Sequence, residues 1–164
     1  MSHYKDELLD FISQHLPAVQ LLQFSVEEAS PERVILSAPL SVNINDKLTA
    51  FGGSQQMLAL TCTWSLVYVN MIHTSQKDQQ FVVARVDTRY RKPVRSERFY
   101  AVAHADSAEL STFSEQAKLG NSTRMLCASG VYESLEEVLQ SDLNQLESSA
   151  ASYLQASFAT TGAK

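Results

Sequence analysis

Two adjacent glycines at the start of an uncharged segment are the residues whose types and spacing could do chemistry. A polar loop over residues 43–47 leads to Gly52-Gly53, and residues 48–76 contain no Lys, Arg, Asp or Glu. This segment is apolar on nearly every face, which predicts a buried helix starting near Ser54 and ending near Ile72. Glycine permits close approach to the backbone, and the free N–H groups of a first helical turn favour a polarised oxygen. The pattern therefore outlines an oxyanion site.

A structural interpretation of the same residues stays open. The two glycines could simply turn the chain, with Ser54 capping the helix. A membrane span is not favoured, because the helix is interrupted by Thr61, Thr63, Ser65 and Asn70. It also falls short of the run of about 20 strongly apolar residues that crosses a bilayer.

The elements that must position this site follow the order of an α+β domain. A short amphipathic helix is expected over residues 8–16, stopped by Pro17. Residues 80–92 alternate Val82, Ala84, Val86, Thr88 and Tyr90 on one face with Val83, Arg85, Asp87, Arg89 and Arg91 on the other, as in a half-buried strand. Further strands are predicted at 24–28, 32–38, 98–105 and 122–132, and a final helix at 134–154 before a frayed tail at 159–164.

A curved antiparallel sheet wrapped around one long helix, the hotdog arrangement, accounts for this order. One sheet covers only part of a helix that is apolar on every face. We therefore expect an obligate homo-oligomer, a dimer or a dimer of dimers, in which sheets join edge to edge.

Composition limits the class of protein. The 164 residues are 45% hydrophobic, which suits one globular domain over residues 1–164. The net charge of −5 argues against sequence-independent nucleic-acid binding. The charged N-terminus lacks the apolar core of a secretory signal, so a cytoplasmic protein with no membrane partner is expected. Cys62 and Cys127 have no metal-ligand spacing and are predicted to be buried thiols.

The loop and helix start, with the strand after the helix, resemble one known family. The matching residues are Asn45-Asp46, Thr49-Ala50-Phe51-Gly52-Gly53-Ser54, Trp64 in the apolar helix, and Arg89-Tyr90-Arg91-Lys92-Pro93-Val94. In these residues the chain resembles the YiiD C-terminal putative thioesterase family of hotdog proteins over about residues 5–135. The resemblance implies thioester chemistry on a pantetheine arm, from acyl-CoA or acyl-ACP, at a dimer interface with the thioester carbonyl near the glycines. No cofactor or metal is implied beyond coenzyme A as part of the substrate.

The sequence also departs from that pattern. Many hotdog thioesterases have His-Gly-Gly at this turn and an acid farther along the helix, whereas Phe51 precedes the glycines here and the helix continues as Leu58-Ala59-Leu60. Hydrolysis needs a group that activates water. Asp46 is the one carboxylate nearby, with a solvated turn residue as its alternative role, and Gln56 is the second candidate. Asn45 and Gly53 complete the predicted catalytic group, and the predicted substrate-binding residues of the loop and helix start are Asn43, Thr49, Phe51, Gly52 and Ser54.

A cationic segment follows the helix. Seven of the 13 basic residues lie between Lys77 and Arg98, against three acids, while residues 133–147 are acidic. The side chains predicted to hold phosphates of coenzyme A or the acidic face of a carrier protein are Arg89, Arg91, Lys92 and Arg95. The alternative is an ordinary solvated strand face, and Asp87 is expected to be an ion-paired surface group.

Three function classes stay open. The leading hypothesis is a thioester hydrolase with Asp46 as base and Gln56 positioning water. A non-catalytic acyl-thioester binding or regulatory module is favoured by the missing helix carboxylate. A hotdog dehydratase would need a His with an acidic partner, whereas His73 and His104 are predicted to be structural or surface residues. Ser129-Gly130 lacks the Gly-x-Ser-x-Gly turn of a nucleophile elbow.

Overall fold

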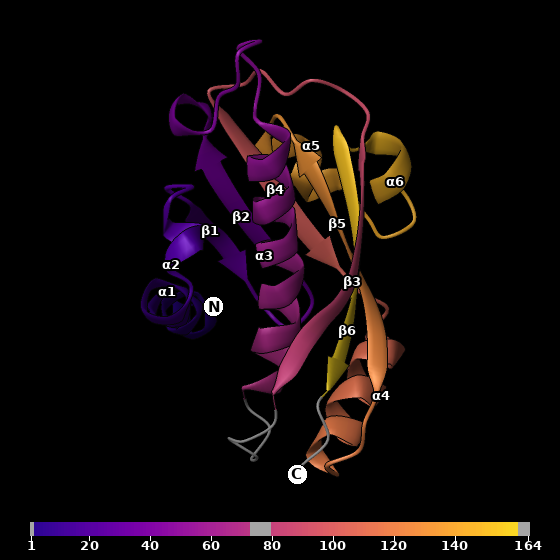
Figure 1. Cartoon of the computed structure of the whole chain (residues 1–164). Helices are drawn as coiled ribbons and strands as arrows, with labels where there is room; N and C mark the ends of the chain where they lie inside the picture. Colours follow the sequence, from indigo (N-terminus) through magenta and orange to yellow (C-terminus); the bar gives the residue numbers. More distant parts are fainter. Residues whose placement is uncertain (1, 73–79, 161–164) are drawn as a thin grey trace.

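A six-stranded antiparallel sheet curls around one long helix in the computed structural model, which describes residues 2–72 and 80–160 (Figure 1). The helices are α1 (Ser2–His15), α2 (Pro17–Gln20), α3 (Gly52–Met71), α4 (Ser107–Lys118), α5 (Leu135–Gln140) and α6 (Leu146–Ser149), with a 3-10 turn η1 (Leu40–Val42). The strands are β1 (Ser25–Ala29), β2 (Val34–Pro39), β3 (Phe81–Tyr90), β4 (Arg98–His104), β5 (Arg124–Tyr132) and β6 (Ser152–Thr160).

The strand order is β1-β2-β4-β5-β6-β3. Alternate residues of each central strand point to opposite faces, and the inner set, such as Leu36 and Phe99, packs with α3. The outer set, including Val102 and Tyr132, forms a second core with Val138 of α5 and Leu146 of α6. A sheet that wraps one helix in this way is the hotdog fold.

The helix α3 carries no charged residue, and this allows it to be buried along most of its surface. Leu58, Cys62 and Leu66 recur every four residues and are fully buried against the sheet. The opposite stripe, which contains Trp64, is half-buried and is partly covered by rings of the same chain. Phe11 of α1 and Phe81 of β3 have ring centroids 5.5 and 5.6 Å from that of Trp64. The chain thus shields part of the helix face that was expected to need a partner.

The strand β3 is an edge strand, and most of its residues are exposed. The sequence predicted a half-buried strand with strict alternation. A register shift between Val83 and Arg85 inserts one residue, so that Val83 faces Phe158 while Arg85 faces Ser157. The predicted alternation therefore holds only beyond this bulge, where Val86 and Thr88 are half-buried as predicted. The prediction was wrong for Val82, Ala84 and Tyr90, which are exposed in the single chain.

The C-terminal region differs most from expectation. The predicted helix over 134–154 is wrong, since only the short helices α5 and α6 form there and residues 152–160 form β6. β6 lies between β5 and β3, with Leu154, Ala156 and Phe158 buried on its inner side. Helix α4 was not predicted either, although Asp106 caps it through hydrogen bonds from the N–H groups of Ala108 and Glu109.

The elements predicted for the first 40 residues agree closely with those in the structure. α1 ends at His15, and Pro17 opens α2 at a position where a missing N–H is tolerated. The predicted hairpin is present as β1 and β2. Among residues 2–72 and 80–160, no helix combines the length and apolarity that a membrane crossing requires.

Candidate active site

The first turn of α3 is the centre of the candidate site. The helix begins at Gly52, and its N-cap is Phe51, whose side chain makes no capping hydrogen bond. The alternative in which Ser54 caps the helix is therefore wrong. The intrahelical ladder starts with the N–H of Gln55, which donates to the carbonyl oxygen of Phe51 at 3.0 Å. The preceding N–H groups have no acceptor within the helix and point out of its end.

The ring of Phe51 lies on Gly53. A Cβ built on Gly53 would stand 2.4 Å from Cε1 of Phe51, which is closer than packed carbon atoms approach. Glycine at this position therefore lets an aromatic ring cover the first helical turn. The ring itself is 55% exposed, so its outer face is open to solvent or to a ligand.

A pocket of about 320 Å³ opens beside this turn. It is lined by Ala50, Gly52, Gln55, Tyr90, Arg91, Lys92 and Pro93. Two segments far apart in the sequence thus meet in one site: the start of α3 and the cationic residues that follow β3. The sequence patterns singled out both segments, and the fold brings them together.

A chain of hydrogen bonds fixes the two sides of the pocket. Nε2 of Gln55 donates to the carbonyl oxygen of Ala50 at 2.8 Å, and its Oε1 accepts from the hydroxyl of Ser152. Next to Ser152, the carbonyl oxygen of Ala151 accepts from the N–H groups of Arg91 at 2.9 Å and Lys92 at 3.0 Å. Ser152, the first residue of β6, therefore holds the helix start, and Ala151 just before it holds Arg91 and Lys92.

Tyr90 adds a direct contact across the pocket. Its hydroxyl donates to the carbonyl oxygen of Gly52 at 3.0 Å, and its ring lies 3.3 Å from where a Cβ of Gly52 would be. A phenol is protonated at neutral pH and can donate, and partial burial raises the pKa of Tyr90 further in the same direction.

The loop before the helix is locked by its own polar side chains. Asn43 is buried, and its Nδ2 donates to the carbonyl oxygens of Leu22 at 2.9 Å and Pro39 at 2.8 Å. Oδ1 of Asn45 accepts from the N–H groups of Lys47 and Thr49, and Nδ2 of Asn45 donates to Oγ1 of Thr49 at 2.9 Å. In the single chain these three predicted site residues stabilise the loop, and none of them lines the pocket.

The predicted base and its helper lie outside the pocket lining. The Asp46 side chain is 81% exposed, and its carboxylate lies 3.4 Å from the ammonium group of Lys47. Gln56 is half-buried on the first turns of α3, whereas its neighbour Gln55 lines the pocket. The catalytic roles of Asp46, Asn45, Gln56 and Gly53 stay predictions.

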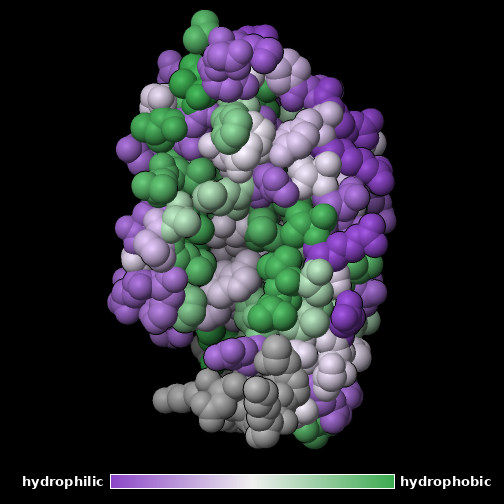
Figure 2. Space-filling view, viewed as in Figure 1, coloured by the Kyte–Doolittle hydropathy of each residue, from purple (hydrophilic) through white to green (hydrophobic). Residues whose placement is uncertain are grey.

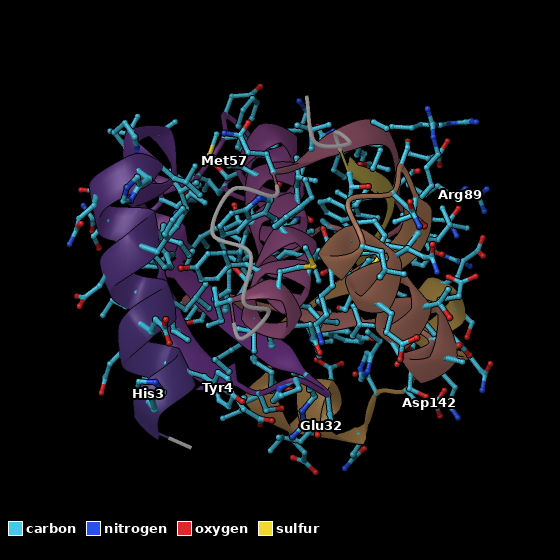
Figure 3. All side chains as sticks on the ribbon, turned by 90° about the horizontal axis from the view of Figure 1, so that it is seen from below. His3, Tyr4, Glu32, Met57, Arg89 and Asp142 are labelled. Carbon is cyan, nitrogen blue, oxygen red and sulfur yellow. The ribbon has the colours of Figure 1, made fainter. Side chains whose placement is uncertain are left out.

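The cationic residues divide into two groups. Arg89 pairs with Glu147 and lies 3.7 Å from Asp87, and Arg91 donates to the carbonyl oxygen of Glu147. Figure 3 places Arg89 at the outer rim of the molecule, with α3 between it and α1. Asp87 is thus the ion-paired surface group that was predicted. By contrast, the side chains of Lys92 and Arg95 form no ion pair within the described residues, and Lys77 lies outside them.

His104 lies on the outer face of the sheet. It contributes to a separate pocket of about 350 Å³, together with Asp106 and Glu109. Among the residues that the structure describes, no group of three His, Cys, Asp or Glu side chains could hold a metal ion. His104 does not line the α3 pocket, and His73 falls outside the described residues.

Sequence reasoning gave no site role to the lining residues Ala50 and Pro93, and it missed three polar residues that build the pocket: Gln55, Tyr90 and Ser152. The sequence Ser54-Gln55-Gln56 contains two adjacent glutamines. Which of them faces the pocket depends on how the helix is rotated about its axis, and the sequence alone does not give that rotation. Tyr90 belonged to the motif Arg89-Tyr90-Arg91-Lys92, in which a binding role was predicted for the basic residues alone. Ser152 could not be found, because its strand was predicted as helix.

The chain belongs to the family described as "Putative thioesterase (yiiD_Cterm)", whose model matches residues 5–141. This identifies a hotdog-fold protein of a thioesterase family, as the sequence motifs predicted. Comparison of the sequence with curated proteins gives no match.

Solved structures share the fold over nearly the whole chain. A protein of unknown function from Chlorobaculum tepidum is 28% identical, with a TM-score of 0.83 over 97% of this chain and 94% of that one. A protein from Shewanella oneidensis described as a "putative thioesterase" is 17% identical, with a TM-score of 0.77 and coverage of 98% and 99%. A thioesterase family protein from Silicibacter pomeroyi is 12% identical, with a TM-score of 0.68 and the same coverage. Family and fold together support a thioesterase function.

Proposed function

We propose that the protein hydrolyses an acyl thioester carried on the pantetheine arm of coenzyme A or of an acyl carrier protein. The observation that carries this proposal is the pocket in which the start of α3 meets the cationic segment after β3. Membership of a thioesterase family supports the reaction class. An open pocket beside unpartnered N–H groups suits a carbonyl oxygen whose negative charge grows as water adds.

In the proposed reaction, the N–H groups of Gly53 and Ser54 bind the thioester carbonyl oxygen. Asp46 removes a proton from water, which adds to the carbonyl carbon, with Gln56 and Asn45 orienting it. The C–S bond then breaks, the acid is released, and the leaving thiolate takes up the proton. Asp46 is exposed in the loop that leads to the helix start, and the exposed ring of Phe51 offers an apolar surface for the acyl group.

We also propose that the working form is a homo-oligomer joined through β3. This strand has one sheet neighbour, β6, and both Val82 and Val83 are exposed. A long exposed edge of this kind pairs readily with a second copy. Sedimentation at micromolar protein should give at least a dimer, and a folded monomer would refute this part of the proposal.

Thiol release from a panel of acyl-CoAs of graded chain length tests the reaction. Asp46→Asn keeps the size of the side chain and removes the base, so kcat should fall about 10²-fold or more with little change in melting temperature. Asp10→Asn, on the exposed part of α1, is the matched control and should keep full activity. Full activity of Asp46→Asn would reject Asp46 as the base and make Gln56→Ala the next test.

A non-catalytic acyl-thioester binding module is the second candidate. One observation favours it: no carboxylate is among the seven residues that line the pocket. If acyl-CoA binds by calorimetry while no chain length is turned over, the binding module replaces the hydrolase.

A further inference from the structure

Two hollows lie next to each other on the outer face of the sheet. The first is the pocket of about 350 Å³ that contains His104, and the second, of about 380 Å³, lies beside β3. Leu126 of β5 lines both hollows, together with Tyr153 and Gln155 of β6. The two hollows are therefore the ends of one groove, which we call the outer groove. It shares no lining residue with the pocket at the start of α3. Figure 2 is viewed from the other side, where hydrophobic residues gather over α3 and β3.

The pairing of four strands sets the length of the outer groove. Asp87 of β3 pairs with Gln155, which also pairs with Ala128 of β5. Ala128 in turn pairs with His104 of β4. Neighbouring strands lie about 4.8 Å apart, so the three steps from β4 to β3 span about 14 Å. Ala128 and Ser157 carry small side chains, which leave the floor of the groove low.

The end of the outer groove beside α4 is acidic. Asp106 and Glu109 line it, and among the described residues no Lys or Arg joins them. Asp106 caps α4 through Oδ1 alone, which leaves its second oxygen available. Glu109 forms no ion pair with any residue in the ranges 2–72 and 80–160. Two carboxylates with free acceptor capacity thus face this end of the groove.

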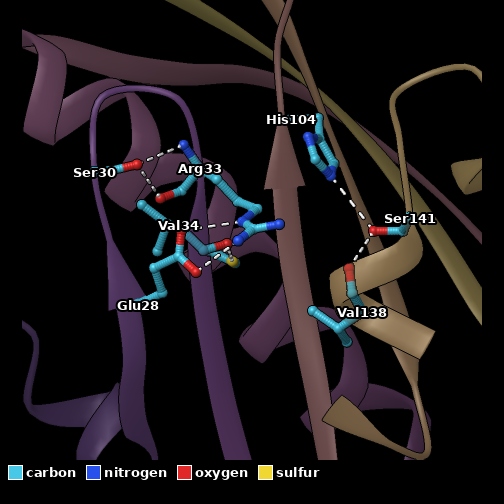
Figure 4. A network of polar contacts seen from close by, with 8 residues as sticks. Glu28, Ser30, Arg33, Val34, His104, Val138 and Ser141 are labelled. Carbon is cyan, nitrogen blue, oxygen red and sulfur yellow. Dashed lines mark hydrogen bonds and ion pairs between the residues drawn. The ribbon is translucent and has the colours of Figure 1, made fainter. Parts of the chain in front are cut away.

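His104 adds no positive charge to the acidic end at neutral pH. Burial, followed by the charge of Arg33, lowers the pKa of its ring, and Asp142 opposes this in part. The guanidinium group of Arg33 is itself paired with the carboxylate of Glu28 at 2.7 Å (Figure 4). The acidic character of this end is therefore not cancelled by its neighbours.

The end of the outer groove beside β3 holds a cation without a partner. Arg89 pairs with Glu147 and with Asp87, so its charge is compensated. Arg85 is exposed on the same face of the strand and forms no ion pair within the described part of the chain. In Figure 3, Arg89 and Asp142 lie on the same side of the molecule, away from α1. The groove therefore has an acidic end and a basic end on one face.

The middle of the outer groove is uncharged and mixed in character. Leu126 and Leu143 are 47% and 39% exposed and offer apolar contacts. Tyr153 is half-buried and Gln155 is exposed, so a phenol hydroxyl and an amide are available between the two ends. Ser157 adds a second hydroxyl. Neutral groups of this kind can hydrogen-bond the N–H and C=O groups of a peptide backbone.

We propose that the outer groove binds a short peptide, with its free amino end at Asp106 and Glu109 and its carboxylate at Arg85. An extended chain advances about 3.3–3.6 Å per residue, so a span of about 14 Å corresponds to about four residues. The charges of the two peptide ends complement those of the two ends of the groove. Pairing of a second copy through the free edge of β3 would leave this face of the sheet uncovered.

Other ligand classes fit the lining less well. A nucleotide or another polyanion would meet four carboxylates against two guanidinium groups, from Asp87, Asp106, Glu109 and Glu147 against Arg85 and Arg89. A polyamine would place a positive charge beside the unpaired guanidinium group. A single amino acid carries both charges on one carbon atom and is too short to reach both ends.

Calorimetry on the whole protein with the tetrapeptide Leu-Ala-Leu-Ala tests the inference. The peptide with free ends should bind, and N-terminal acetylation or C-terminal amidation should each weaken binding about fivefold or more, because each removes one charged end. Glu109→Gln should remove most of the effect of acetylation, and Arg85→Gln most of the effect of amidation. Glu115→Gln and Arg124→Gln, at exposed positions outside the lining, are the matched controls and should leave both effects in place.

Several results would overturn the inference. These are no binding of the free peptide at about 10 mM, binding of spermidine as strong as that of the peptide, or effects of blocked ends that persist in Glu109→Gln and Arg85→Gln. A changed sedimentation of either variant would show that the outer face contacts a second copy, and the inference would again be wrong. Thiol release from acyl-CoA should be the same in both variants as in the wild type, so the proposed function and this inference can fail independently.

Discussion

Oε1 of Gln55 accepts a hydrogen bond from the hydroxyl of Ser152, which ties the first turn of α3 to the first residue of β6. Both side chains are buried, and Nε2 of Gln55 also donates to Ala50. One amide therefore joins three segments that surround the pocket: the loop before α3, the helix and the last strand. The shape of the pocket depends on this amide even if it never touches substrate.

Replacing Gln55 by Leu should lower the free energy of unfolding by about 1–3 kcal/mol, because a buried hydroxyl and a carbonyl oxygen lose their partner. Urea denaturation measures the change. Gln56→Leu is the matched control, since Gln56 is half-buried and makes no such link, and it should stay within about 0.5 kcal/mol. Equal stability of the two variants would contradict the role assigned to Gln55.

Gly130 of β5 permits close packing of α6 on the outer face of the sheet. A Cβ at this position would lie 2.8 Å from Cε2 of Tyr132, 2.9 Å from Cδ2 of Leu146 and 3.0 Å from Cβ of Ala150. Gly130→Ala should therefore destabilise the protein by about 1–3 kcal/mol in thermal or urea unfolding. The double variant with Leu146→Val, which removes one of the contacts, should lose less than the sum of the single variants; strict additivity would argue against this clash.

Both cysteine thiols should be unreactive in the folded protein. Cys62 and Cys127 are fully buried, and burial raises the pKa of each thiol far above its ordinary value. Since the thiolate is the reactive form, a chromogenic disulfide reagent at pH 8 should modify neither residue until denaturant is added. Two equivalents should then react. Rapid modification without denaturant would show that the core opens around α3.

The stability of the protein should fall below neutral pH because of His104. Partial burial, followed by the nearby Arg33 charge, lowers the pKa of the ring, and Asp142 opposes this in part. The hydroxyl of Ser141 donates to the carbonyl oxygen of Val138 at 2.8 Å, so Nε2 of His104 donates to Ser141, at 3.4 Å (Figure 4). The folded protein thus favours the neutral ring.

The sign of the pH effect follows from these pKa values. The unfolded ring takes up a proton near pH 6.5 while the folded ring resists it, so the stabilising contribution is present above that pH. It is lost as the pH falls through the lowered folded pKa. The urea midpoint should therefore drop between pH 7.5 and 5, and His104→Gln should reduce the drop. His15→Gln, at an exposed position of α1, should leave it unchanged; equal slopes for wild type and His104→Gln would refute the assignment.

Elements with strong local signals could be predicted from the sequence. The uncharged run over residues 48–76 predicted α3 within two residues of its start, because burial on all sides excludes charge. The β-branched run of β2 predicted the hairpin with β1. For the site, the sequence identified the glycines and the cationic residues as two separate features. The family resemblance, whose motif contains both, already suggested that they belong to one site.

Elements that depend on long-range contacts could not be predicted. β6 contains Ala and Ser, which also suit helices, and its alternation of Leu154, Ala156 and Phe158 has meaning only beside β5. The bulge at Val83 and Arg85 has no local signal, since one inserted residue changes the facing of the strand without changing its composition. The pocket residues Gln55 and Ser152 are 97 positions apart in the sequence, and only the sheet order makes them neighbours.

The position of β6 also sets an order for folding. β3 lies near the middle of the chain, yet its one strand neighbour among the described residues consists of residues 152–160. During synthesis β3 therefore leaves the ribosome with both edges unpaired and waits through more than 60 residues, which include β4, α4 and β5, before a partner strand exists. Nascent chains with an exposed, partly apolar edge are prone to mispair. The sheet can close only after residues 152–160 have left the ribosome. The Gln55–Ser152 hydrogen bond at the pocket can also form only at that late stage.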